Sequence, residues 1–187
     1  MKSLVDNLFE YTKVRQAGTK LSINRIDLIQ MMEQLVASFG LEANKHGMNI
    51  SSQDADGPIY IEADAEKLGR VFNNLISNAI KYGKGGKNIY LAAKKVNEHE
   101  AVINVSNDGP KIPAEAIHSI FDRFYRVEES RNKNTGGSGL GLAITQSIVA
   151  LHGGYINVTS TDELTTFEIH LPVKHGEKLK QAKMVTD

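Results

Sequence analysis

Three segments of this chain alternate apolar with polar residues, and this alternation limits the possible folds more than any other feature. In the segment 166–173, the apolar positions are Phe167, Ile169, Leu171 and Val173. The segments 89–93 and 101–105 show the same period of two. Such a period is typical of a strand with one face in a core and the other in water. The sequence therefore predicts a sheet whose second face is not buried.

Other segments repeat their apolar residues at helical spacing and can cover the buried face of that sheet. Helices are expected over 3–16, 28–39, 64–82, 113–124 and 140–151. Further short strands are expected at 48–52, 59–62 and 156–158. The fold class that follows is an α/β (α+β) two-layer sandwich, with a mixed, mainly antiparallel sheet and helices on one face.

Charge balance and cysteine content exclude several classes of protein. The 187 residues include 22 Lys and Arg and 22 Asp and Glu, so the formal net charge is zero. We expect no nucleic-acid partner, because nonspecific binding to nucleic acid usually needs a basic surface. With no cysteine, the chain forms neither disulfides nor thiolate metal sites. No apolar run is long enough to cross a bilayer, so we expect no membrane contact by this chain.

The segment 64–82 carries a polar stripe beside its apolar one. The apolar stripe consists of Leu68, Phe72, Leu75 and Ala79. Asn74, Asn78 and Lys81 follow one another at i, i+4 and i+7, with Tyr82 at the edge of the stripe. An Asn oxygen can take a coordination position of Mg²⁺, a Lys can neutralise a phosphate, and a Tyr offers a flat surface to a base or ribose. Taken alone, such a stripe is more often a solvated helix face.

Two segments that contain glycine are candidates for phosphate and base contacts. The run Gly137–Leu142 leads straight into a helix, where backbone N–H groups and the helix dipole favour phosphate. It is neither a P-loop nor a convincing dinucleotide fingerprint. In Asn107–Pro113, which follows a strand, a side-chain oxygen could accept from an adenine amino group, and Gly109 would let a base approach the backbone. Taken alone, these segments indicate a hinge and a plain turn.

The segment 120–126 combines aromatic residues with an arginine. Phe121 and Phe124 are expected in the core, at helical spacing from their apolar neighbours. Arg126, and Arg131 beyond it, could reach phosphate oxygens. The stretch 125–138 is polar and rich in glycine, with almost nothing to pack. By default, its charged residues belong to a solvated loop.

Together and in this order, these four segments resemble the catalytic, ATP-binding domain of sensor histidine kinases. That domain belongs to the Bergerat-type ATP-binding superfamily, which also includes gyrase and a large heat-shock chaperone. The asparagine box of the family resembles Asn74–Tyr82, its phenylalanine box resembles Phe121–Arg126, and its glycine box resembles Gly137–Leu142. Four motifs in a fixed order make the match specific.

The resemblance also implies a division of the chain and a parent protein. Residues 20–173 correspond to the ATP-binding domain, with the Bergerat fold. Residues 1–19 resemble the end of the second helix of the dimerisation and phosphoacceptor domain, and the charged tail 174–187 is expected to be disordered. The family implies a cytoplasmic domain of a cell-membrane sensor protein that forms a homodimer. We expect the fragment itself to be a monomer, because it carries at most half of the dimerising bundle.

ATP and Mg²⁺ are the cofactors that the resemblance implies. Asn78 would bind Mg²⁺, with Asn74 close to the metal or the phosphates. Lys81 and Arg126 would contact phosphates. Residues 125–138 would form a lid over the ATP, from which Arg131 would meet the γ-phosphate. The catalytic set is therefore Asn78, Lys81, Arg126 and Arg131.

The remaining nucleotide contacts are carried over in the same way. Tyr82 would face the base or ribose, and Thr165 matches a family hydroxyl that binds adenine through water. The other residues expected at the nucleotide are Asn107, Gly109, Ile112, Tyr125, Gly137, Ser138, Gly139, Leu140, Gly141 and Leu142.

The chain departs from the family pattern Asp-x-Gly-x-Gly at two positions. Asn107 replaces the aspartate that reads adenine, and Lys111 replaces the second glycine. The Asn oxygen can still accept from the adenine amino group, but it lacks the charge, so lower affinity is expected. Asp108 could substitute only in a different backbone register. Lys111 puts close approach of the backbone to the base in doubt.

None of the six histidines stands in the context expected of a phosphoacceptor. The family places that histidine on an upstream helix, which we expect to lie outside this chain. The resemblance thus implies a protein-histidine kinase domain that binds Mg–ATP and donates the γ-phosphate to a separate helical domain, for transfer to a response regulator. Asn74 stands where water-activating members of the superfamily carry a glutamate, so slow hydrolysis of ATP is expected.

Three other readings remain open. A nucleotide-binding regulatory module without transferase activity would fit Asn107 and Lys111. A Bergerat-type ATPase would hydrolyse ATP in isolation, which Asn74 disfavours. A non-enzymatic helical interaction fragment would account for the first helix only. Within the kinases, the motifs around residues 7–13 and 165–171 are most similar to the group that controls vancomycin resistance.

Overall fold

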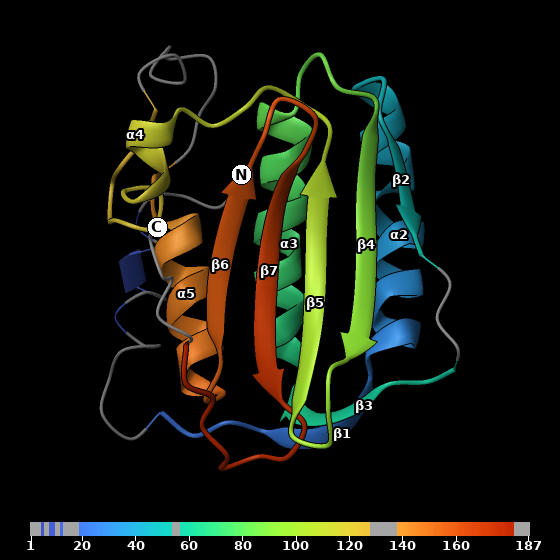
Figure 1. Cartoon of the computed structure of the whole chain (residues 1–187), viewed down its shortest axis with the longest axis vertical. Coiled ribbons are helices and arrows are strands. Elements are labelled where there is room, and N and C mark those ends of the chain that lie inside the picture. Colours follow the sequence, from blue (N-terminus) through green and yellow to red (C-terminus); the bar gives the residue numbers. More distant parts are fainter. Residues whose placement is uncertain are drawn as a thin grey trace.

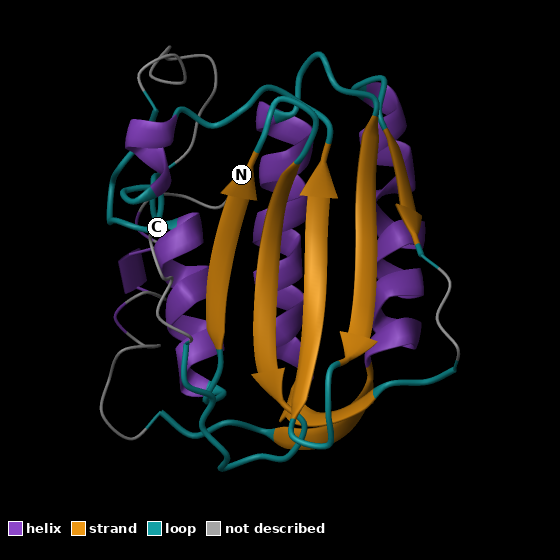
Figure 2. Cartoon of the chain, viewed as in Figure 1, coloured by secondary structure: helices purple, strands orange, loops and turns teal. Residues whose placement is uncertain are grey.

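A five-stranded sheet and a layer of helices make up a two-layer sandwich in the computed structural model, which describes residues 5, 8, 9, 12, 19–53, 57–127 and 138–181 (Figures 1 and 2). The strand order is β2-β4-β5-β7-β6. The bounds in that order are Asn49–Ser52, Asn88–Lys95, Glu100–Asn107, Thr165–Pro172 and Tyr155–Ser160. Only the β2–β4 pair of this sheet is parallel. The predicted fold class is confirmed.

The helices pack on one face of the large sheet (Figure 1). They are α2 (Leu28–Lys45), α3 (Ala65–Tyr82), α4 (Ala114–Ile117) and α5 (Gly141–Leu151). Asp27 caps α2 by accepting the Ile29 N–H at 3.0 Å. The central helix α3 buries its predicted apolar stripe almost completely, with Phe72 1% exposed. Burial of this stripe against the sheet anchors the polar stripe beside it.

The other face of the large sheet carries no helix in the described part of the chain (Figure 2). Most of the side chains on this face are polar. The imidazole of His170 lies there between two carboxylates, 2.6 Å from Glu100 and 2.7 Å from Glu168. It also stacks on Tyr155, with 4.2 Å between the ring centroids. The prediction for β7 is thus confirmed: its apolar residues face the helices, and its polar residues face outward.

A two-stranded ribbon crosses the lower end of the sandwich in Figure 1 and is not predicted from the sequence. It pairs β1 (Ile23–Asp27) with β3 (Tyr60–Asp64) in antiparallel register. Only Ile26 in β1 is buried, so the strand lacks the alternation that identifies the others. The Arg25 guanidinium lies 3.9 Å from the centroid of the Tyr60 ring and joins the two strands on their exposed side.

The helix expected over 113–124 is much shorter in the structure, and one of its core residues is placed wrongly by the sequence. It ends at Ile117. Phe121 does reach the core, where it meets Phe167 edge to face. Phe124, in contrast, is 57% exposed. Its backbone adopts φ 62°, a left-handed conformation that no residue takes inside a helix.

Most of the predicted first helix and half of the tail lie outside the described residues. Within 3–16, Val5, Leu8, Phe9 and Thr12 are described, and all of them are helical and exposed. In the segment 174–181, the Leu179 N–H donates to the Gly153 oxygen at 2.8 Å, among other bonds.

Candidate functional site

The polar stripe of α3 and the glycine-rich segment meet at the side chain of Asn74. Its Nδ2 donates to the Gly141 oxygen at 3.2 Å and lies 3.5 Å from the Thr145 hydroxyl, both on α5. Thr145 is fully buried, so this contact fixes the first turn of α5 against the middle of α3. Two segments that the sequence predicts separately therefore form one surface.

The rest of the polar stripe lies along α3 toward its C-terminal end. Asn78 is half-buried, and within the described part of the chain its amide makes no hydrogen bond. The Lys81 ammonium donates to the Tyr82 hydroxyl at 2.9 Å and lies 4.6 Å from the centroid of the Tyr82 ring. One half-buried face thus presents an amide, a cation and an aromatic ring.

The aromatic and glycine-rich segments are joined by a backbone hydrogen bond. The Phe124 N–H donates to the Gly139 oxygen at 2.9 Å. Gly139 has φ 67°, and a Cβ there would lie 2.7 Å from the Phe124 Cα, so only glycine fits. Leu140, the N-cap of α5, is fully buried and provides no side-chain cap. The first N–H groups of α5 therefore have no capping side chain and can bind an anion.

Asn107 ends β5 on the face that points at the helices. It is 8% exposed, and it lies opposite Thr165 of β7 in the register of the sheet. Its Nδ2 lies 3.2 Å from the position that a Cβ on Gly83, the C-cap of α3, would occupy. The side chain therefore lies beneath the end of α3 that carries Lys81 and Tyr82.

The neighbouring carboxylate of Asp108 is held elsewhere. It accepts the backbone N–H groups of Lys87 at 2.7 Å and Asn88 at 2.8 Å, and the Asn88 side-chain amide at 2.8 Å. Burial alone would raise the pKa of Asp108, but these hydrogen bonds to the ionised form outweigh it and lower the pKa. Asp108 therefore fixes the loop between α3 and β4, and it is not a substitute for Asn107.

Packing also explains Gly109, which keeps the family pattern, and Lys111, which departs from it. A Cβ on Gly109 would lie 2.4 Å from the Gly83 Cα, so glycine is needed here for contact with the end of α3. The Lys111 ammonium turns outward to Asp162, 3.4 Å away on an exposed turn. The side chain at the position of the missing second glycine thus points away from Asn107.

A chain of hydroxyl groups ties the loop after β5 to the sheet. The Ile112 N–H donates to the Ser160 hydroxyl at 2.9 Å, and this hydroxyl lies 2.6 Å from that of Thr165. Sequence reasoning singled out Thr165 and Ile112 but missed Ser160, as it missed Thr145. The only signal for Ser160 is its place as a polar residue at the end of a strand. The only signal for Thr145 is its place on an apolar helix face.

The remaining predicted residues flank this surface or lie outside the described part. Tyr125 and Arg126 are half-buried beside Phe124, and Tyr125 packs against the core. Ser138 accepts the Leu140 N–H at 3.3 Å. Arg131 and Gly137 lie outside the described residues.

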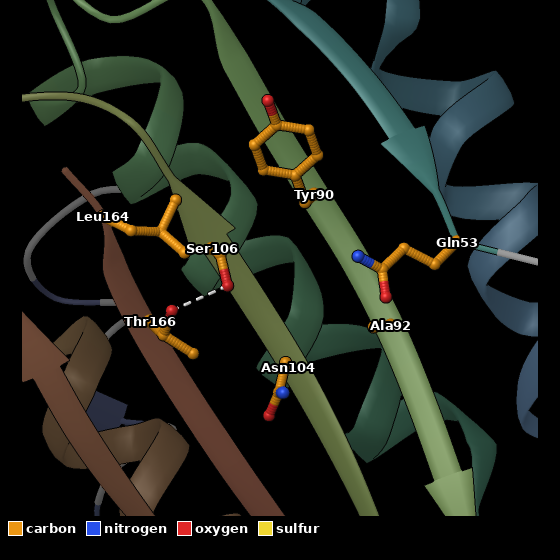
Figure 3. Close-up of a pocket in the computed structure, with 7 residues that line it drawn as sticks. All are labelled: Gln53, Tyr90, Ala92, Asn104, Ser106, Leu164 and Thr166. Carbon is orange, nitrogen blue, oxygen red and sulfur yellow. Dashed lines mark hydrogen bonds between the residues drawn. The ribbon is translucent and has the colours of Figure 1, made fainter.

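A shallow hollow of about 340 Å³ lies on the opposite face of the sheet and is separate from this surface (Figure 3). Its polar lining includes Tyr90, Asn104, Ser106 and Thr166. The Ser106 and Thr166 hydroxyls are 2.8 Å apart and hydrogen-bonded to each other. The sheet itself stands between this hollow and α3, so the hollow is no part of the candidate site.

Two further searches cover the described residues only. Among them, no group of three or more His, Asp or Glu side chains is arranged to hold a metal ion. None of their helices combines the length and apolar character that crossing a membrane requires.

The sheet is covered by helices on one face only. Its central helix carries two amides and a cation, and an uncapped helix preceded by glycine lies beside it. Together these features define an ATP-binding domain of the Bergerat fold. Residues 63–175 match the family model described as histidine kinase-, DNA gyrase B- and HSP90-like ATPase. The chain belongs to this family, and its membership implies that it binds ATP. Its relatives place it with the ATP-binding domains of sensor histidine kinases.

Among the relatives is the sensor protein VanS of Enterococcus faecium, which is 35% identical over 172 residues. That match covers 92% of this chain but 44% of VanS, so the chain spans less than half of this relative. Full-length ShkA in complex with AMPPNP has the same fold, with a TM-score of 0.81, 24% identity, and coverage of 93% of this chain and 36% of ShkA. A complex of the histidine kinase ThkA with the response regulator TrrA gives a TM-score of 0.72 at 24% identity, covering 91% and 46%.

Proposed function

We propose that this chain binds Mg–ATP between α3 and α5 and provides the γ-phosphate for transfer to a histidine on another segment of its parent protein. The observation that carries the proposal is the contact of Asn74 with Gly141, because it joins the polar stripe of α3 to the uncapped start of α5. Phosphates could lie between these two surfaces, close to the N–H groups of α5 and the ammonium of Lys81.

In this proposal, Mg²⁺ is held mainly by phosphate oxygens and water, with Asn78 as its protein ligand. Such a site suits Mg²⁺, which keeps several waters and seldom takes an all-protein cage. The unpaired amide of Asn78 fits this role, since its oxygen is available without breaking a bond to the protein. The ion would neutralise charge on the phosphates. Arg126 and Arg131 would add positive charge as the phosphoryl group leaves.

Asn74 supports transfer rather than hydrolysis. Its amide cannot serve as a general base toward water, and its Nδ2 already donates a hydrogen bond to α5. The attacking imidazole would come from the parent's phosphoacceptor helix, and a response regulator would receive the phosphoryl group next. Membrane anchorage, dimerisation of the parent and control of vancomycin resistance belong to the same proposal, supported by the similarity to VanS.

The division of the chain is also part of the proposal. Residues 20–173 would be the ATP-binding unit, residues 1–19 the end of a dimerisation helix, and residues 174–187 a tail. The family match over 63–175 supports the core of this division. Residues 125–138 would close over the nucleotide from the hinge formed by Phe124 and Gly139.

Calorimetric titration with Mg–ATP tests the site, using a pair of matched variants on α3. Asn78→Ala should weaken binding at least about tenfold, because it removes a metal ligand. Asn73→Ala makes the same chemical change at an exposed position of the same helix and should leave binding unchanged. Equal affinities in the two variants would contradict the proposal.

Radiolabelled ATP separates the proposed kinase from its alternatives. With γ-labelled ATP, the chain alone should neither label itself nor release phosphate at an appreciable rate, whereas the parent protein should become labelled. Binding without any labelling of the parent would favour a regulatory module. Rapid release of phosphate by the isolated chain would favour an ATPase.

A further inference from the structure

The side chain of Asn107 is an exception among the buried polar residues that the structure describes. The others all have a hydrogen-bond partner, and they are Asp64, Ser106, Thr145, His152 and Thr165. Asn107 is 8% exposed, and its amide has no hydrogen-bond partner among the residues that the structure describes. The amide therefore keeps both its donor and its acceptor available for a ligand.

The position of this amide suggests which ligand it meets. It lies beneath the C-terminal end of α3, 3.2 Å from a Cβ built on Gly83, and faces the same side of the sheet as Thr165. The tip of β5, where it is found, lies in front of that end of α3 in Figure 1. Asn107 also stands where the family pattern has the residue that reads adenine, so the inference that follows rests on the proposed function.

A carboxamide and a carboxylate select bases differently. An ionised carboxylate only accepts hydrogen bonds, whereas an amide offers a donor and an acceptor. Adenine presents an amino donor at position 6 next to a ring-nitrogen acceptor, and a 6-oxopurine presents the reverse, an oxygen acceptor next to an N–H donor. A carboxylate that faces position 6 accepts from the amino group of adenine and is repelled by the oxygen of a 6-oxopurine. An amide fits both, because turning it by half a turn exchanges its two ends.

Nothing near Asn107 restores the preference for adenine. The carboxylate of Asp108 is held by Lys87 and Asn88, and the carboxylate of Asp162 pairs with Lys111. The hydroxyl of Thr165 can donate or accept, since either it or Ser160 supplies the proton of their shared hydrogen bond. Among the described side chains around Asn107, these groups therefore leave no free carboxylate.

We propose that Asn107 makes the base pocket permissive, so that this chain accepts 6-oxopurine nucleoside triphosphates as well as ATP. Inosine triphosphate is the sharpest probe, because it carries the 6-oxo edge without the 2-amino group of guanine. Its dissociation constant should lie within about tenfold of that of ATP, since both bases can form the same number of hydrogen bonds with the amide.

The test is calorimetric titration of the whole chain with Mg–ATP and Mg–ITP, with Asn107→Asp as the variant. This variant should raise the ratio of the ITP to the ATP dissociation constant at least about tenfold, the effect of one hydrogen bond replaced by repulsion. Asn104→Asp makes the same change on the same strand but on the opposite face of the sheet, so its ratio should match that of the wild type.

The outcomes separate this inference from the function on which it rests. Binding of ATP together with rejection of ITP by more than about a hundredfold in the wild type would overturn the inference and leave the function standing. An unchanged ratio in Asn107→Asp would also overturn it. Failure of both nucleotides to bind would overturn the proposed function and the inference with it. If Asn107→Asp does not fold, the wild-type ratio alone decides.

Discussion

Stability toward acid should depend on one buried histidine. His152 is 4% exposed and joins the end of α5 to the start of α3. Its Nε2 accepts the Asp64 N–H at 3.1 Å, and its Nδ1 lies 2.8 Å from the Ile148 oxygen, to which it donates. Only the neutral ring with its proton on Nδ1 makes both bonds. Burial lowers the pKa of His152, and the nearby Ile148 oxygen and Asp64 carboxylate oppose this only in part.

The size of the effect follows from the linkage between protonation and folding. The unfolded chain protonates His152 near its ordinary pKa of 6.5, whereas the folded chain keeps it neutral to lower pH. Below 6.5 the unfolded state therefore binds more protons, and stability falls as pH decreases toward the folded-state pKa. The slope is about 1.4 kcal/mol per pH unit. The loss continues until the pH reaches the lowered folded-state pKa of His152.

His152→Gln isolates this contribution. A glutamine amide can accept from Asp64 and donate to Ile148 without titrating. Urea unfolding followed by circular dichroism suits this chain, which has no tryptophan. As the pH falls below about 6.5, the wild type should lose stability more steeply than the variant, by up to about 1.4 kcal/mol per pH unit. The two proteins share every other ionisable group, so the difference between their pH profiles reports the change at residue 152. Parallel pH profiles for the two proteins would refute the reasoning.

Other substitutions test the close contact at Gly109, the open space at Gly40 and the backbone strain at Phe124. Gly109→Ala should destabilise the fold by about 2 kcal/mol in urea unfolding, because its Cβ would meet Gly83 at 2.4 Å. Gly40→Ala, inside α2 with no atom within 4 Å of the new Cβ, should stabilise it by about 1 kcal/mol, and equal effects would contradict both assignments. Phe124→Gly should be more stable than Phe124→Ala by about 1 kcal/mol, because the backbone there has φ 62°. An ordinary exposed position would give the opposite order in thermal unfolding.

Much of the fold could be predicted from the sequence because its strands and long helices bury one face each. The core of α3 follows from Leu68, Phe72, Leu75 and Ala79, which repeat at helical spacing and are all buried. The strand β1 was missed because its pairing with β3 depends on contacts distant in sequence, with only Ile26 buried in β1. Local periodicity carries no trace of such a pairing.

Phe124 illustrates a different limit. Its apolar side chain and its spacing from Phe121 favour a core position, but the backbone decides otherwise. The hydrogen bond to Gly139 and the close approach of that glycine hold Phe124 in a left-handed conformation and turn its side chain to solvent. Helical periodicity assumes a continuous helix, and here the helix ends at Ile117.

The candidate site was predictable in its residue types but not in its connections. Asn74, Asn78 and Lys81 follow from their spacing on one helix, which is a local property. The bond from Asn74 to Gly141 spans two segments far apart in the sequence. The Asp108 carboxylate is hydrogen-bonded and the Asn107 amide is not, because of the loop geometry around them. Each of these states is set by tertiary contacts.

The hydrogen bond between Phe124 and Gly139 has a consequence for how sequences of this kind can vary. The bond joins the two ends of the segment between them. The entropy lost in closing that loop therefore does not depend on how the helices on either side pack. Because that entropy grows only with the logarithm of length, doubling the segment would cost about 0.6 kcal/mol. Insertions here therefore cost the fold little, so the length of the segment can change while the packing of the helices is kept.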